Sequence, residues 1–155
     1  MFNKTSLLFI LFMTNIIVLA AQNDPTLQKP LRVAIVGLVH DHAHGILGRA
    51  NRGDIEIVGI AEPNRALAEK YSKQYGYSMN LVYATMEELI EKTKPAAVLA
   101  FNNIYDHLKV VEYCAPRGIH VMVEKPLAVS TEHANKMISL ARKHNIHLLT
   151  NYETT

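Results

Sequence analysis

The chain has 155 residues, enough for one domain with a sizeable hydrophobic core and too few for two large domains. Its 16 Lys and Arg residues nearly balance its 14 Asp and Glu residues, and the net charge is +2. The basic residues are scattered rather than grouped, so we predict no nucleic-acid partner. The single cysteine, Cys114, excludes an internal disulfide. It lies on the apolar face of a predicted helix, which indicates a buried, unreactive thiol.

Residues 1–21 have the pattern of a secretory signal peptide. A short basic region precedes an apolar run from Leu7 to Ala20, and small residues near its end suit cleavage. The run is shorter than the ~20 residues that a membrane span needs. We therefore expect an exported protein, periplasmic or secreted, with no membrane span after cleavage. Residues 22–30 are polar and contain proline, and they are predicted to be a linker.

From residue 31 to residue 150, short apolar runs alternate with segments of helical periodicity. The predicted strands are Arg32–Val36, Ile55–Ala61, the weaker Asn80–Tyr83, Ala96–Phe101, His120–Val123 and Ile146–Leu149. The runs are almost continuously apolar, as in parallel strands that helices cover on both faces. The alternation predicts right-handed crossovers and one α/β domain, a doubly wound, six-stranded parallel sheet of the Rossmann type.

Capping residues mark the ends of the predicted helices, the first of which follows a turn at Gly37. They are Asn64 and Gly76 for the second helix, Thr85 with Glu88 (a capping box) for the third, Gly118 after the fourth (Tyr105–Arg117), and Ser130 or Thr131 for the fifth, which runs to His144. Residues 151–155 follow the last predicted strand. We expect them to begin a second domain that this chain lacks.

The turn after the first strand occupies the place where a dinucleotide-binding fold contacts a pyrophosphate. In the usual G-x-G-x-x-G pattern the first glycine makes the tight turn, the second lets the pyrophosphate approach, and the third lets the helix pack. Gly37 fills the first place, whereas Val39 and His42 stand in the second and third. We predict an atypical cofactor site formed by Gly37, Leu38, Val39, His40 and His42.

The polar residues of this turn, His40, Asp41, His42 and His44, leave three alternatives open. They could be solvated or structural, they could donate hydrogen bonds to a cofactor phosphate, or they could hold a metal ion, as in some barrel hydrolases. The chain is too short for such a barrel and offers no obvious later ligands in the right order. We therefore predict no metal ligand, and a metal-dependent hydrolase is the less favoured function.

Charged residues follow the second and fifth strands. Glu62 stands at about the spacing from Gly37 at which NAD-binding folds place a carboxylate that accepts hydrogen bonds from ribose hydroxyls and repels a 2′-phosphate. NAD is therefore the predicted cofactor, and NADP is less favoured. Glu124 and Lys125 precede Pro126 at the carboxyl end of the fifth strand, where open α/β sheets bind ligands. A strand-end salt bridge explains this pair equally well.

Several segments occur together in a set order. They are Val33-Ala-Ile-Val-Gly37, Gly59-Ile-Ala-Glu-Pro-Asn-Arg65, Glu87-Glu-Leu89 ahead of Ala97-Val-Leu99, His107, and Gly118-Ile-His-Val-Met-Val-Glu-Lys-Pro126. With these segments, the chain from Leu31 to about Asn151 resembles the nucleotide-binding domain of the glucose–fructose oxidoreductase / inositol dehydrogenase / MocA family. The Glu-Lys-Pro segment is the hallmark of that family.

The resemblance implies site residues as well as a fold. Lys125 would be the catalytic residue beside the nicotinamide and the substrate hydroxyl, with Glu124 next to it in the cofactor crevice. The residues that would line the cofactor after the fourth strand are Phe101, Asn102 and Asn103, with His107 nearby. Gly37 would face the pyrophosphate and Glu62 the ribose.

The resemblance also implies a function, an exported NAD-dependent oxidoreductase acting on a sugar, a polyol or a related hydroxy compound. The family's second domain, which supplies a catalytic aspartate and histidine, is not expected within 155 residues, so we expect NAD binding without turnover by this chain alone. Two alternatives remain, a redox-assisted glycosidase of the same family that holds NAD tightly, and a non-catalytic Rossmann binding module. A surface left bare by the second domain could also drive homo-oligomerisation.

Overall fold

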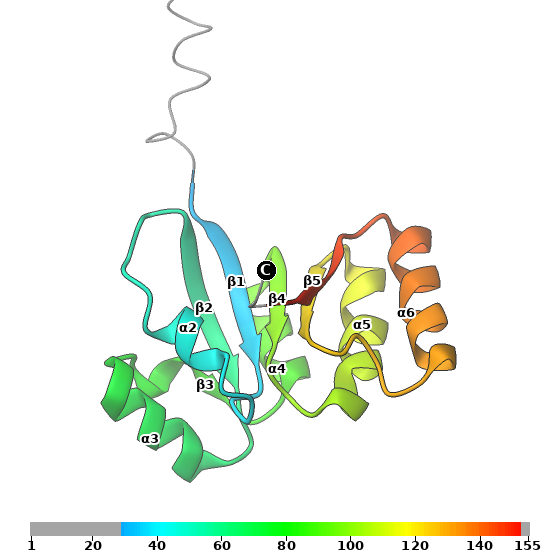
Figure 1. Ribbon diagram of the computed structural model, residues 1–155. Helices are drawn as coiled ribbons and strands as arrows, with labels where there is room; N and C mark the ends of the chain where they lie inside the picture. The colour runs from blue at the N-terminus through cyan, green and yellow to red at the C-terminus, as the bar shows by residue number, and fades with distance from the viewer. Residues whose placement is uncertain (1–28, 153–155) are drawn as a thin grey trace, which may run out of the picture. The chain divides into compact units, whose positions relative to one another are not determined.

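A parallel six-stranded sheet organises the part of the chain that the computed structural model describes, residues 29–152 (Figure 1). Its strands are β1 (Leu31–Val36), β2 (Ile55–Ala61), β3 (Val82–Tyr83), β4 (Ala97–Ala100), β5 (His120–Glu124) and β6 (Leu148–Asn151). They lie in the order β3-β2-β1-β4-β5-β6, and every neighbouring pair is parallel. This is the doubly wound order of dinucleotide-binding folds, so the predicted fold class is confirmed.

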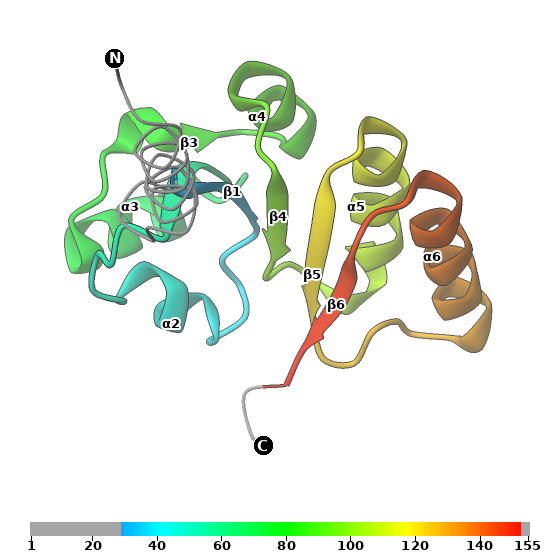
Figure 2. The ribbon, with the colours of Figure 1, turned by 90° about the horizontal axis from the view of Figure 1, so that it is seen from above.

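Helices cover both faces of the sheet (Figures 1 and 2). One face packs against α2 (Ala43–Leu47) and α3 (Arg65–Tyr75), and the other against α4 (Met86–Thr93), α5 (His107–Cys114) and α6 (Thr131–His144). Short 3-10 turns, η2 (Met79–Leu81), η3 (Ile104–Asp106) and η4 (Ala115–Arg117), connect or extend these elements. Within residues 29–152, no helix is both long enough and apolar enough to cross a membrane. The predicted signal peptide and nearly all of the predicted linker lie outside the described residues.

The central strands are buried on both sides, which explains their continuous apolar sequence. In β1, Ile35 packs into the core beneath α2 and α3, whereas Ala34 and Val36 pack into the larger core beneath α4, α5 and α6. Cys114 belongs to the larger core and is fully buried, as predicted, and burial raises the pKa of its thiol to about 12. At neutral pH this thiol is therefore protonated and inaccessible.

The predicted helix caps are present. The capping hydrogen bonds run from Leu67 N–H to Asn64 Oδ1, from Glu88 N–H to Thr85 Oγ1, and from His133 N–H to Ser130 Oγ. Caps of this type stabilise a helix by about 1 kcal/mol each. Gly76 and Gly118 adopt the left-handed conformation that ends a helix, with φ of 76° and 70°.

Three predicted elements differ from the structure by more than a one-residue shift at an end. The predicted helix Tyr105–Arg117 is divided into η3, α5 and η4, and α5 gives way to η4 at Pro116, which has no N–H to continue an α-helix. The third strand is only two residues long, because η2 takes up the residues before it. The last strand begins later than predicted and continues to Asn151, one residue past the predicted domain end, where it pairs with Glu124.

Candidate functional site

The predicted site residues gather at the carboxyl edge of the sheet, because β1, β2, β4 and β5 are parallel and their following loops emerge on the same side. In open α/β sheets this edge is where ligands bind, at the point where the strand order reverses. Here the order reverses between β1 and β4. The loop after β1 and the loop after β4 therefore frame the candidate site.

The loop after β1 is held against both neighbouring strands. Gly37 N–H donates a hydrogen bond to the carbonyl of Ala61 at 2.8 Å, and His40 N–H donates one to the carbonyl of Phe101 at 3.1 Å. Gly37 has φ of +80°, and a Cβ atom there would lie 2.6 Å from the Cα of Asn102. The two loops touch backbone to backbone, which only glycine allows.

Glu62 fixes the same loop from the end of β2. Glu62 is only 4% exposed, and each of its carboxylate oxygens accepts one backbone hydrogen bond. Leu38 N–H donates to Oε2 and Asn64 N–H donates to Oε1, both at 2.8 Å. Since each carboxylate oxygen has a second lone pair, Glu62 retains the capacity to accept hydrogen bonds from a ligand.

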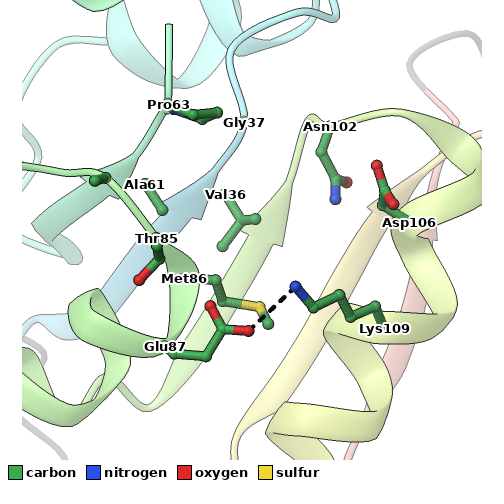
Figure 3. A pocket seen from close by; sticks show the side chains of 11 residues that line it. Val36, Gly37, Ala61, Pro63, Thr85, Met86, Glu87, Asn102, Asp106 and Lys109 are labelled. Atoms are coloured by element: carbon green, nitrogen blue, oxygen red, sulfur yellow. Dashed lines mark ion pairs between the residues drawn. The ribbon is translucent and has the colours of Figure 1, made fainter. Parts of the chain in front are cut away.

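A pocket of about 280 Å³ opens between the ends of β1, β2 and β4 and the start of α4 (Figure 3). Its lining residues are Val36, Gly37, Ala61, Pro63, Ala84, Thr85, Met86, Glu87, Asn102, Asp106 and Lys109. Asn102 Oδ1 is buried in this region and has no hydrogen-bond partner among the described residues. A buried acceptor of this kind destabilises the protein unless a partner is supplied, and a ligand donor would supply one.

An ion pair joins the two helices beside this pocket. Lys109 Nζ, on α5, lies 3.2 Å from Glu87 Oε1, on α4, and Figure 3 shows the two side chains reaching toward each other. The pKa of the Glu87 carboxyl is lowered, first by a hydrogen bond from its own backbone N–H and then by Lys109. The Glu87 carboxylate is therefore ionised at neutral pH, and its ion pair with Lys109 forms one side of the pocket.

A second group of polar side chains lies between the loop after β1 and the end of β5. His42 Nδ1 is 2.9 Å from Glu124 Oε2, and His40 Nδ1 is 3.7 Å from the same oxygen. The other carboxylate oxygen, Oε1, accepts a 2.6 Å hydrogen bond from Asn151 Nδ2 on β6. The Glu124 side chain is fully buried. Its two oxygens contact side chains that are distant in the sequence, those of His40 and His42 on one side and that of Asn151 on the other.

The other two polar residues of the loop do not join this group. His44 turns toward α3, where its ring nitrogens are hydrogen bonded to the hydroxyls of Tyr71 and Tyr75. Asp41 is exposed. The four polar residues of the turn therefore do not act as one unit, and only His40 and His42 face Glu124.

Lys125 and the loop that follows it complete the edge. The Lys125 side chain is exposed, and the peptide bond between Lys125 and Pro126 is cis. His107 supports this loop from α5, because its Nδ1 donates a hydrogen bond to the carbonyl of Leu127 at 3.2 Å. His107 is fully buried, and burial lowers the pKa of its imidazole. It therefore positions the loop, and its Nε2 is buried with no hydrogen-bond partner among the described residues.

The remaining predicted site residues contribute in different ways. The side chains of Leu38 and Phe101 lie in the core beneath α2 and α3, so only their backbone atoms are near the site. Asn103 Oδ1 accepts a hydrogen bond from Tyr105 N–H and caps η3. The Val39 side chain is 63% exposed in the loop. Sequence reasoning missed Asn151, whose only sequence signal was its place beyond the last apolar run.

Comparison with known proteins agrees with this geometry. The family model described as an oxidoreductase family with an NAD-binding Rossmann fold (GFO_IDH_MocA) matches residues 31–152. The chain is 31% identical over 118 residues to D-glucoside 3-dehydrogenase of Escherichia coli, covering 75% of this chain and 33% of that protein. It is 26% identical over 121 residues to the rhizopine catabolism protein MocA of Rhizobium meliloti, covering 78% and 37%. The chain thus spans about a third of the length of these relatives.

Solved structures agree on the fold. A putative NADPH-dependent oxidoreductase from Desulfitobacterium hafniense superposes with a TM-score of 0.69 at 26% identity, over 81% of this chain and 35% of that one. The WlbA dehydrogenase from Chromobacterium violaceum, solved with NADH and UDP-GlcNAcA, superposes with a TM-score of 0.70 at 22% identity, over 81% and 36%. The predicted resemblance is confirmed: residues 31–152 of this chain belong to the glucose–fructose oxidoreductase / inositol dehydrogenase / MocA family of oxidoreductases with an NAD-binding Rossmann fold.

Proposed function

We propose that this chain binds NAD along the carboxyl edge of its sheet and forms the cofactor-binding part of an exported oxidoreductase that acts on a sugar, a polyol or a related hydroxy compound. The observation that carries the proposal is the order of features on one edge. The pocket, which Gly37 and Asn102 line, lies at the ends of β2, β1 and β4, and the exposed Lys125 follows β5, the next strand of the sheet. An extended dinucleotide needs a row of sites of this kind.

The pocket suits the adenosine end. It is bounded by apolar residues from β1, β2 and α4, against which a flat ring can pack, and Asn102 Oδ1 is an acceptor in need of a donor. Beside it, Glu62 can accept hydrogen bonds from ribose hydroxyls through its remaining lone pairs. The same carboxylate would repel a 2′-phosphate, so we propose NAD rather than NADP.

The loop after β1 suits the pyrophosphate, although it differs from a glycine-rich loop. Gly37 lets the loop pass close to Asn102. Val39 stands where a second glycine is usual, but its side chain points into solvent and leaves the backbone approachable. His40 and His42 are partly buried in this loop and could donate hydrogen bonds to a phosphate.

Lys125 would act at the nicotinamide end. When bound, NAD supplies a hydride acceptor for a carbinol carbon. The Lys125 ammonium group can donate a hydrogen bond to the substrate hydroxyl oxygen and stabilise the negative charge that develops there as the proton passes to a general base, which the family resemblance assigns to a histidine of the second domain. Glu124 and the loop held by His107 orient the lysine at the end of β5.

The substrate class and the export are supported by separate features. The similarity to D-glucoside 3-dehydrogenase favours a carbohydrate substrate. The signal-peptide pattern of residues 1–21 favours export to the periplasm or the medium. Because the chain spans only about a third of its relatives, the proposal for this chain alone is cofactor binding.

Calorimetric titration of the full chain with NAD and with NADP tests the proposal. We expect one site per chain, with NAD binding at least about tenfold tighter than NADP, a difference of about 1.4 kcal/mol. The variant Asn102→Ala should weaken NAD binding, whereas Asn135→Ala, an exposed residue on α6, should not. An absence of binding heat at millimolar NAD would overturn the proposal, and tighter binding of NADP would overturn the choice of cofactor.

A further inference from the structure

The group formed by His40, His42 and Glu124 has the composition of a metal site. These residues each offer one ligand atom, and the three atoms all lie within 4.8 Å of one another. We propose that they bind a single divalent transition-metal ion of the zinc type, at the carboxyl edge of the sheet between the loop after β1 and the end of β5. Its ligands lie beside the cofactor path of the proposed function, so the two proposals are tested separately, one with the metal alone and one with NAD alone.

The distances fit one ion. Zinc binds histidine nitrogen and carboxylate oxygen at about 2.0–2.2 Å, so two ligands in tetrahedral geometry lie roughly 3.4 Å apart. The distances to Glu124 Oε2 are 2.9 Å from His42 Nδ1 and 3.7 Å from His40 Nδ1, which bracket that value. The histidine rings lie with centroids 4.5 Å apart at 66°, so they do not stack face to face. Small side-chain rotations would bring all three ligands onto one ion.

Metal binding would break one existing hydrogen bond. The backbone N–H of His42 donates to His40 Nδ1 at 3.3 Å, and His40 Nδ1 would bind the ion instead. A hydrogen bond of that length is weak, and the His42 N–H lies in a partly buried loop. Its loss is small beside the free energy that a histidine–metal bond supplies.

Burial and charge favour an ion at this position. The side chains of His40 and His42 are only 26% and 20% exposed, and that of Glu124 is fully buried. A buried carboxylate is destabilising unless it is neutralised and hydrogen bonded. Asn151 Nδ2 donates to Oε1 at 2.6 Å and leaves Oε2 directed at the two histidines. Such a second hydrogen bond orients a metal-binding carboxylate, as outer-shell partners do in known sites.

The ligand types select the metal class. Two imidazoles and one carboxylate form the ligand set of catalytic zinc sites, which leave a fourth position open for water or a substrate oxygen. Mg²⁺ prefers oxygen ligands only and would bind weakly here. The open position would be free to bind water or an oxygen atom of a ligand.

A second histidine pair in the same chain provides a matched control. His120 and His147 lie side by side on the sheet with ring centroids 4.7 Å apart, close to the 4.5 Å of His40 and His42. Among residues 29–152, however, they belong to no three-ligand group. If paired histidines alone sufficed for metal binding, both pairs would bind equally.

Titration of the full chain with Zn²⁺ alone, followed by calorimetry, and with Co²⁺, followed by visible absorption, tests the proposal. We expect one ion per chain and a Co²⁺ spectrum typical of mixed nitrogen and oxygen ligands. Asn151→Ala, which removes the orienting hydrogen bond, should weaken binding by about 10–100-fold. Glu124→Gln and His42→Ala each remove a ligand and should weaken it further, whereas the double variant His120→Ala/His147→Ala should bind as tightly as the parent chain.

Folding of each variant is checked by far-UV circular dichroism and by the melting temperature. Zn²⁺ should raise the melting temperature of the parent chain and of the His120/His147 control, and it should not raise that of Glu124→Gln, because ligands that bind the native state stabilise it. Absence of one-to-one binding in the folded parent chain, or loss of binding in the His120/His147 control with retention in Glu124→Gln, would overturn the proposal. Neither titration contains nucleotide, so its failure leaves the NAD proposal untouched.

Discussion

Two buried glutamates, Glu62 and Glu124, occupy matching places in the fold and are held in different ways. Glu124 ends β5, Glu62 directly follows β2, and both lie at the carboxyl edge with side chains almost inaccessible to solvent. Glu62 accepts its hydrogen bonds from the backbone N–H groups of Leu38 and Asn64. Glu124 is held by the side chains of His42 and Asn151.

The type of hydrogen-bond partner indicates that the Glu62 carboxylate is structural, whereas the Glu124 carboxylate can exchange its partners. Backbone donors keep their places as long as the loop is folded. Glu62 therefore stabilises the loop after β1, in addition to its proposed role in binding a ribose. Side-chain partners can rotate, and an imidazole can exchange a proton for a metal ion. We therefore expect changes at Glu62 to act first on stability and changes at Glu124 to act first on binding.

The largest loss of stability is expected at Gly37, in the loop that Glu62 holds, because there is no room for a side chain there. Gly37→Ala forces a side chain into a left-handed conformation and against the backbone of Asn102, and it should lower the free energy of unfolding by about 2–5 kcal/mol. Gly53→Ala is the control, since Gly53 has a similar φ of +73° but nothing within 4 Å of an added Cβ. It should lose only about 1–2 kcal/mol. Urea unfolding measures both, and equal losses would contradict the role of close packing.

Removal of the Glu62 carboxylate should have the next largest effect. Glu62→Ala leaves the N–H groups of Leu38 and Asn64 without their acceptor, which should lower the free energy of unfolding by roughly 2–4 kcal/mol. Glu62→Gln keeps one acceptor oxygen and should lose about half as much. Urea unfolding of the two variants provides the measurement. A loss below about 0.5 kcal/mol in Glu62→Ala would show that water replaces the carboxylate and that the loop does not depend on it.

Glu124→Gln should be milder for stability than Glu62→Gln. The amide oxygen can still accept from Asn151, and the amide N–H₂ can donate to His42 Nδ1, so a loss of about 1 kcal/mol or less is expected. For Zn²⁺ affinity we expect the opposite order. Glu124→Gln should weaken Zn²⁺ binding, whereas Glu62→Gln should leave it unchanged. Urea unfolding and Zn²⁺ titration of Glu62→Gln and Glu124→Gln measure the stability and the Zn²⁺ affinity of each variant. The comparison fails if Glu124→Gln is the more destabilising substitution.

The smallest effect concerns His107, which supports the loop after Glu124. Burial lowers the pKa of this imidazole below its ordinary value of 6.5, so the unfolded chain binds the proton more readily than the native chain. Stability should therefore fall as the pH falls from about 7 through 6.5 toward the lower native pKa. His107→Gln keeps a donor for the Leu127 carbonyl and should flatten this part of the profile relative to the parent chain. Unfolding free energies between pH 5 and 8 measure the difference, and identical profiles would show that the buried imidazole is protonated as easily as in the unfolded chain.

Much of the fold was predictable because it depends on local patterns. Continuous apolar runs identify strands buried on both faces, and cap residues such as Asn64 and Gly118 are recognisable because they satisfy backbone groups a few positions away. The extent of an element is less predictable. β6 continues to Asn151 since β5 offers it a partner as far as Glu124, and no local signal announces that pairing.

Local patterns in the sequence are enough to predict the strands, the glycine turn and the positions of Glu62, Glu124 and Lys125 at strand ends, because each depends on residues that are neighbours in the chain. The contacts of the two carboxylates depend instead on the folded sheet. His42 and Glu124 are 82 positions apart, and Asn151 lies a further 27 positions on. They meet because β1, β4, β5 and β6 lie side by side and parallel, which delivers the ends of distant strands to one edge. Hydrophobic periodicity specifies that a strand is buried, but the order of the strands, and with it the composition of the site, arises from the packing of the whole sheet.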